Sequence, residues 1–152
     1  MAKKYFNLIF YRAAGAVISS ATKGGSYPNY TISGWTLVPG GIADKAKIGL
    51  ADDGKDGMGD GTEYTSGEKE AVEIIVKNFT AANHASIRSA FLNVKVDVLM
   101  MDSEQPGTAY VAHGIVLYPK PDINGGEEPM ITISGERKVG AGLSLFAPIT
   151  VS

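Results

Sequence analysis

Four carboxylates in a glycine-rich stretch of the sequence have the spacing of a calcium-binding loop. They stand at the first, fifth, ninth and twelfth places of a twelve-residue segment: Asp52, Asp56, Asp60 and Glu63. Gly57 stands at the sixth place, where such loops need a glycine for a sharp turn. Carboxylate oxygens at these places suit Ca²⁺, so the segment is a candidate Ca²⁺ site.

Other positions of the same segment argue against calcium. Gly54 stands at the third place, where Asp or Asn is usual, and Gly59 at the eighth, where an apolar residue usually anchors the loop. Neither flank has the periodicity of a helix. The main interpretation is a solvated Gly/Asp loop whose charges keep an exposed segment soluble, and calcium binding is the alternative.

The other residues that could do chemistry form no catalytic pattern. The chain has no cysteine, which removes disulfides, thiol nucleophiles and thiolate metal sites. Its two histidines, His84 and His113, have no visible partner in the sequence and are interpreted as surface or packing residues. No serine-nucleophile, phosphate-loop, zinc-helix or dinucleotide motif occurs. We therefore predict that the protein is not an enzyme and carries no cofactor.

Three aromatic residues suggest one alternative function. Trp35, Tyr27 and Tyr30 could form a stacking platform, and with residues 52–63 as a calcium site they would describe a calcium-dependent carbohydrate- or ligand-binding β module. Such residues more often pack or form interfaces, so packing is the main interpretation.

Length, composition and charge set the broad class. The 152 residues fit a single domain, residues 1–152, and 19 glycines and seven prolines favour strands joined by turns over long helices. A net charge of −2 offers no broad cationic surface for nucleic acid. No apolar stretch is long enough to span a membrane or to act as a signal sequence, so we expect no membrane anchor and synthesis in a cytoplasm.

The periodicity of apolar residues predicts a mostly β chain. In residues 5–12 apolar residues occupy both the odd and the even positions, which point to opposite faces of a strand. This strand therefore needs cover on both faces. Residues 83–92 have the pattern of a short α-helix, with Asn83 as a possible cap and Asn93 at its end. Alternating patterns predict further strands at residues 71–79, 94–102, 108–118, 130–139 and 143–151. About six to eight strands and one helix indicate a β-sandwich or barrel-like domain.

The segment at residues 34–67 has a different composition. Glycine and charged residues dominate it, and only short apolar pieces interrupt them. Compact domains rarely contain so long a connection unless it is functional or ordered by a partner. We therefore predict an extended loop or arm.

The order of elements in the second half resembles the tail-tube (major tail) protein family of tailed bacteriophages. The resemblance is architectural and covers mainly residues 71–139: a strand at 71–79, the helix at 83–92, strands at 94–102 and 109–118, a turn at 122–126 and a strand at 130–139. It implies β-sandwich subunits that assemble with themselves into rings, commonly hexameric, which stack into a tube around a channel. The long loop would then reach a neighbouring ring.

The resemblance also implies a place and partners. The protein would be a virion structural component located in the tail and assembled in the host bacterial cytoplasm, next to other virion structural proteins. DNA would pass through the tube without specific binding, which the weakly acidic balance suits. Another phage part, such as a head–tail connector, a baseplate subunit or a capsid decoration protein, is the alternative within this class.

Overall fold

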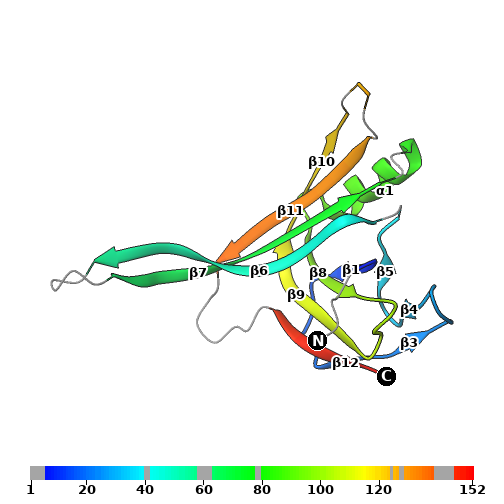
Figure 1. Cartoon of the computed structure of the whole chain (residues 1–152), viewed down its shortest axis with the longest axis horizontal. Helices are drawn as coiled ribbons and strands as arrows, with labels where there is room; N and C mark the ends of the chain where they lie inside the picture. Colours follow the sequence, from blue (N-terminus) through cyan, green and yellow to red (C-terminus); the bar gives the residue numbers. More distant parts are fainter. Residues whose placement is uncertain are drawn as a thin grey trace.

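A computed structural model describes residues 6–39, 42–57, 63–77, 80–123, 125–126, 129–138 and 146–152. Figure 1 shows that these residues form mostly strands, with one short helix. The strands are β1 (Leu8–Ala13), β2 (Ser20–Ala21), β3 (Lys23–Gly24), β4 (Thr31–Ile32), β5 (Thr36–Leu37), β6 (Ile42–Gly57), β7 (Glu63–Val76), β8 (Lys95–Met101), β9 (Thr108–Val116), β10 (Tyr118–Asp122), β11 (Met130–Lys138) and β12 (Phe146–Val151). The helix, α1, spans Ala81–Phe91.

Most strands belong to two sheets that enclose a common core. The larger sheet has the order β2-β12-β9-β8-β1-β5, and the smaller has the order β10-β11-β7-β6. Neighbouring strands are antiparallel except β2 and β12, which are parallel. β3 and β4 pair separately. This arrangement confirms the expected mostly β, sandwich-like fold.

The six-stranded sheet is buried on both faces because its central strands are apolar at both parities. Ile9 of β1 packs in the main core, together with inward residues of the four-stranded sheet and of α1. Leu8 and Phe10 point the other way, into a second core that Ile32 and Trp35 of the N-terminal region help to cover. The prediction that this strand needs cover on both faces is therefore confirmed.

The predicted unit of strand, helix and strand is present as β7, α1 and β8. The expected cap is wrong, because Thr80 is the N-cap and its hydroxyl accepts the backbone N–H of Asn83 at 3.1 Å. Asn93 follows the helix with a φ of 57°, a conformation that asparagine tolerates better than most residues, so it does end the helix. Ile87 and Phe91 bury the apolar face of α1 in the main core.

One strand passes from the larger sheet to the smaller. β9 pairs with β8 and β12, and after the buried Leu117 the chain continues as β10, which pairs with β11. Gly135 of β11 lies against this bend, and a Cβ there would stand 2.3 Å from the carbonyl oxygen of Val116. Only glycine lets the backbones come so close, so Gly135 fixes how the two sheets join.

The glycine-rich arm is a long β-hairpin rather than an open loop. β6 and β7 pair in register from Ile42 and Val76 to Gly57 and Glu63, with irregularities along the way. The strand expected to begin at residue 71 therefore begins at Glu63. Backbone pairing explains the difference, because a ladder can continue where no apolar alternation marks it. Figure 1 shows the hairpin projecting from the body of the molecule.

Candidate assembly interface

In the described residues, the far part of the β6–β7 hairpin has no third strand. β11 pairs with β7 only from Val76 to Lys69, so Asp52–Gly57 and Glu63–Glu68 pair with each other alone within the described residues. Six residues of strand reach about 20 Å beyond the last pair with β11. A two-stranded ribbon is marginally stable in water, and both of its edges carry unpaired backbone groups. We call residues 52–68 the hairpin extension.

The hairpin extension is strongly acidic. Its sequence contains six carboxylates and one lysine, a net charge of −5, whereas the whole chain has a net charge of −2. The rest of the chain therefore carries +3. The two parts of one molecule have opposite charge, and the acidic part is the one that projects.

The two edges of the four-stranded sheet differ in hydrogen-bonding capacity. β6 forms one edge and contains no proline, so it offers both N–H and C=O groups. β10 forms the other edge and contains Pro119 and Pro121, two residues of the same parity. Proline has no backbone N–H. It is therefore accepted in an edge strand at positions where the N–H would point to solvent and not to the neighbouring strand. The free edge of β10 therefore presents carbonyl oxygens and no N–H donors.

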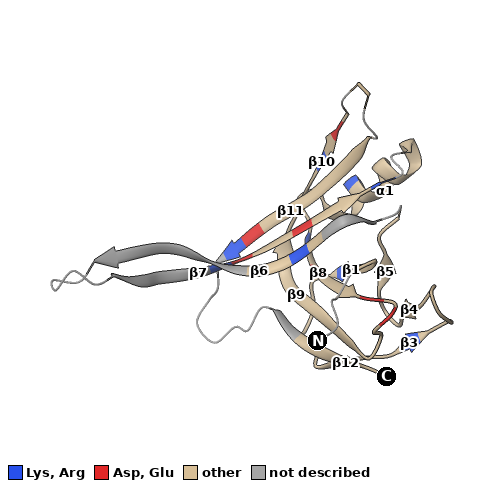
Figure 2. Cartoon of the chain, in the orientation of Figure 1, with Lys and Arg blue, Asp and Glu red and all other residues tan. Residues whose placement is uncertain are grey.

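The outer face of the four-stranded sheet is polar and slightly hollowed. Lys47, Glu73, Ser134 and Glu136 line a shallow depression of about 360 Å³. Lys69 and Glu136 form an ion pair across the strands at 3.2 Å. Figure 2 shows acidic and basic residues interspersed along β11, β7 and β6. Mixed charge of this kind keeps a face hydrated and gives it no strong preference for one sign of ligand.

A buried carboxylate ties the larger sheet together. Asp97 of β8 is fully buried and accepts hydrogen bonds from Arg12 Nε at 3.0 Å, from the Gly114 N–H at 2.7 Å and from the Gly15 N–H at 3.1 Å. Gly114 has a φ of 63°, which glycine adopts at little cost. One side chain thus links β1, β9 and the turn after β1.

A second buried acid lies at the base of the hairpin. Glu70 of β7 is fully buried on the same side as Val72, and neither of its carboxyl oxygens has a hydrogen-bond partner within the described residues. Burial raises the pKa of Glu70 from an ordinary 4.5 to about 7, and Arg137, opposite it on β11, lowers the pKa in part. Arg137 also donates hydrogen bonds to the carbonyls of His113 and Gly114.

Sequence reasoning missed both buried acids, although the signals were present. Glu70 is two residues before Val72 and so points to the same face of β7 as Val72, Ile74 and Val76. Because that face is buried, the alternation itself places Glu70 in the interior. Asp97 alternates with valines in the sequence, and its burial was not predicted. Its strand is in fact apolar at both parities through Leu99 and Met101, so it has no solvent face.

Three of the four residues of the candidate calcium site lie in strands. Asp52 and Asp56 lie in β6 and Glu63 begins β7, while Asp60 lies outside the described residues. In the described part of the chain no group of three or more His, Asp or Glu residues could hold a metal ion. Calcium binding by residues 52–63 stays a prediction.

The two histidines lie on different elements. His84 is in the first turn of α1, where its N–H bonds to the Thr80 carbonyl at 2.9 Å. His113 is buried in β9, and its Nε2 accepts the N–H of Ile18 at 3.3 Å. Both positions suit residues that hold the structure.

The aromatic residues near the N-terminus do not present three open ring faces. The guanidinium of Arg12 lies 4.5 Å from the ring centroid of Trp35, and the ammonium of Lys23 lies 5.9 Å from that of Tyr30. Both rings also pack against the second core. Tyr27 is 55% exposed, and its hydroxyl donates to Glu104; this hydrogen bond, and then the charge of Glu104, raise the pKa of the tyrosine. This arrangement favours packing over ligand stacking.

No protein-family model matches the chain, and no curated protein matches its sequence. In the described ranges, α1 is too short to cross a membrane, and no other helix is present to do so.

Proposed function

We propose that the protein is a structural subunit that assembles with copies of itself, specifically a tail-tube subunit of a tailed bacteriophage. Copies close into rings, hexameric in the family that the sequence resembles, and the rings stack into a conduit for DNA. The subunit is not catalytic, and in the virion it contacts other structural proteins of the tail. The single observation that carries the proposal is the hairpin extension.

The hairpin extension supports assembly because the residues that the structure describes give it no third strand. Past the last pair with β11, its two strands pair only with each other in the described part of the chain, so both outer edges there carry backbone groups without a strand partner. Proteins usually shorten, cover or block such edges to prevent unwanted pairing. A ribbon of this length is best accounted for if a neighbouring copy covers it.

The chemistry of the remaining edges supports contacts between unlike surfaces. The edges of the four-stranded sheet are β6 and β10, and only β6 has free N–H groups. Contacts between two different surfaces of one protein generate closed rings or open stacks, which are the two components of a tube. A head–tail connector or baseplate ring would use the same contacts without stacking.

The proposal is tested with full-length protein and a hairpin-shortened variant. The shortened variant has residues 53–67 replaced by Asn-Gly, so that Asp52 and Glu68, which pair in the hairpin, flank a two-residue turn. We expect rings or tubes of the wild type by negative-stain microscopy and a large species by sedimentation velocity. We expect the variant to lose stacking and to keep its thermal unfolding transition, because the replaced residues lie past the β11 pairing.

The outcomes separate the possible functions. Wild-type protein that remains a monomer at every concentration refutes self-assembly, and rings that never stack favour a connector or baseplate role. A variant that still forms tubes refutes the role given to the hairpin extension. A monomer that binds a glycan only with calcium favours the ligand-binding alternative.

A further inference from the structure

Three exposed hydrophobic residues gather at one corner of the sandwich. Val116 and Tyr118 flank the buried Leu117 at the bend from β9 to β10, and they are 49% and 56% exposed. Val94 is 37% exposed and precedes Lys95, the residue that pairs with Val116 across β8 and β9. Apolar side chains that cluster on a surface mark an interaction site more often than scattered ones do.

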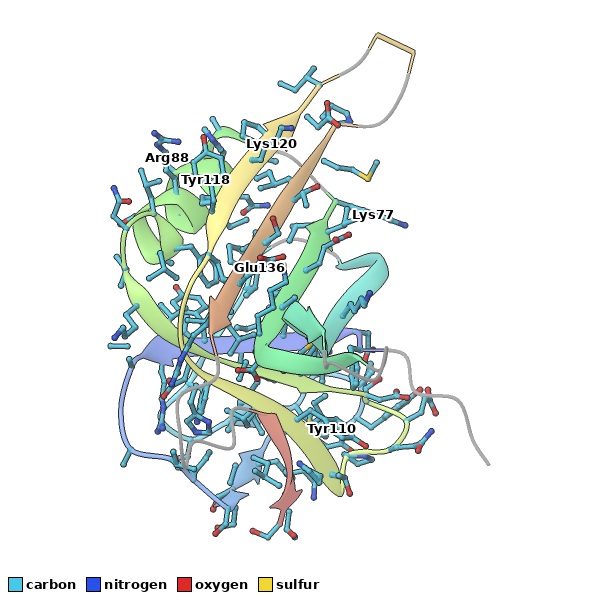
Figure 3. All side chains as sticks on the ribbon, turned by 90° about the vertical axis from the view of Figure 1, so that its left-hand side faces the viewer. Lys77, Arg88, Tyr110, Tyr118, Lys120 and Glu136 are labelled. Atoms are coloured by element: carbon cyan, nitrogen blue, oxygen red, sulfur yellow. The ribbon has the colours of Figure 1, made fainter. Side chains whose placement is uncertain are left out.

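Three cations border this apolar corner. Lys95 lies on β8, Lys120 on β10 and Arg88 in the last turn of α1, which packs against β10. Figure 3 shows Arg88, Tyr118 and Lys120 at the same end of the molecule. None of the three cations forms an ion pair within the residues that the structure describes. We call these six residues the corner patch: Arg88, Val94, Lys95, Val116, Tyr118 and Lys120.

The corner patch and the hairpin extension are complementary in charge. The corner patch has three cations, and the hairpin extension has a net charge of −5. Opposite potentials on two surfaces steer their encounter and fix their register. The apolar residues of the corner patch supply the desolvated centre that charge alone does not.

The two surfaces are also complementary in backbone hydrogen bonding. The β10 edge beside the corner patch offers carbonyl oxygens and no N–H groups, because Pro119 and Pro121 occupy its free positions. The hairpin extension has no partner for its outer edges in the described residues, and its two strands contain no proline. Its free N–H groups can therefore donate to the β10 carbonyls.

We propose that the hairpin extension of one copy docks on the corner patch of a second copy. The described strands of the extension point away from the body in Figure 1, so they do not meet the corner patch of their own chain. The contact joins two different surfaces, so each bound copy still has one of the two surfaces free. A further copy can bind there, and the contact repeats from copy to copy. This inference rests on the proposed self-assembly and names the two surfaces that meet.

A charge exchange between two full-length variants tests the contact. The patch variant carries R88E, K95E and K120E, and the extension variant carries D52K, D53K and D56K. Each variant alone places like charges in contact, which costs several kcal/mol, so we expect the concentration needed for assembly to rise at least about a hundredfold. An equimolar mixture restores opposite charges at every contact, and assembly should return, measured by sedimentation velocity and microscopy.

A matched control separates this contact from general charge effects. K23E, K47E and K77E make the same change in net charge away from the corner patch, and this variant should assemble as the wild type does. If the patch variant assembles normally, or if the mixture stays dissociated while both variants keep wild-type thermal unfolding, the docking inference is wrong. Failure of the wild type to assemble would instead refute the proposed function.

Discussion

Replacing Glu70 with glutamine should remove a pH dependence of folding stability. The Glu70 carboxyl is buried without a hydrogen-bond partner in the described residues, and its pKa is raised from 4.5 to about 7. The folded state therefore holds a proton between these values that the unfolded state has released. The contribution of Glu70 to stability is present below about pH 4.5 and is lost as pH rises to about 7.

The size of the effect follows from the two pKa values. One pKa unit corresponds to 1.36 kcal/mol, so the wild type should lose about 3 kcal/mol of its free energy of unfolding through Glu70 between about pH 4.5 and pH 8. A neutral glutamine has no such loss. Glu70→Gln should resemble the wild type near pH 4 and be the more stable protein at pH 8, by up to about 3 kcal/mol.

Urea unfolding at several pH values measures this difference. The quantity to compare is the stability of Glu70→Gln minus that of the wild type, because other groups titrate equally in both proteins. Glu73→Gln, on the outer face of the same strand, is the matched control and should keep the wild-type profile. Parallel profiles for Glu70→Gln and the wild type would show that the buried carboxyl does not hold the extra proton.

Two further substitutions test the positions that join the sheets, with thermal and urea unfolding as the measurements. Gly135→Ala places a Cβ 2.3 Å from a backbone oxygen and should lower the free energy of unfolding by at least about 2 kcal/mol. The control Gly107→Ala places a Cβ with no atom within 4 Å and should be nearly neutral. Equal effects of the two substitutions would contradict the close approach at Gly135. Asp97→Asn leaves Arg12 without its buried carboxylate and should cost about 3 kcal/mol, whereas Glu136→Gln, which removes an exposed ion pair, should cost less than about 1 kcal/mol.

The sequence predicted elements best where one face of a strand is buried. Val72, Ile74 and Val76 are buried and alternate with partly exposed residues, because β7 lies between the core and solvent, and Ile131 and Ile133 of β11 are buried in the same alternating way. A period of two then reports directly which side chains point inward. The N-terminal strand was equally predictable, because apolar residues at both parities require two cores.

The hairpin and the helix cap could not be predicted in the same way. In the described residues β7 has no pair with β11 before Lys69. The sequence of that part, where Asp56 pairs with Tyr64, has no apolar alternation to detect. Thr80 and Asn83 are both good capping residues three positions apart. The extended backbone of Thr80, with a φ of −107° and a ψ of 160°, decides between them, and residue type alone does not.

The edges of the four-stranded sheet also explain why like surfaces should not pair. Two β10 edges cannot form a ladder with each other, since Pro119 and Pro121 leave both without N–H donors. Two β6 edges have donors, but antiparallel pairing along the extension would bring Asp52, Asp53 and Asp56 of both copies together, and like charges opposite each other destabilise a sheet. Pairing between unlike edges avoids both costs, because one edge supplies the N–H groups and the other supplies carbonyls beside cations. The same residues that block a symmetric dimer thus favour the head-to-tail contact from which rings and stacked tubes are built.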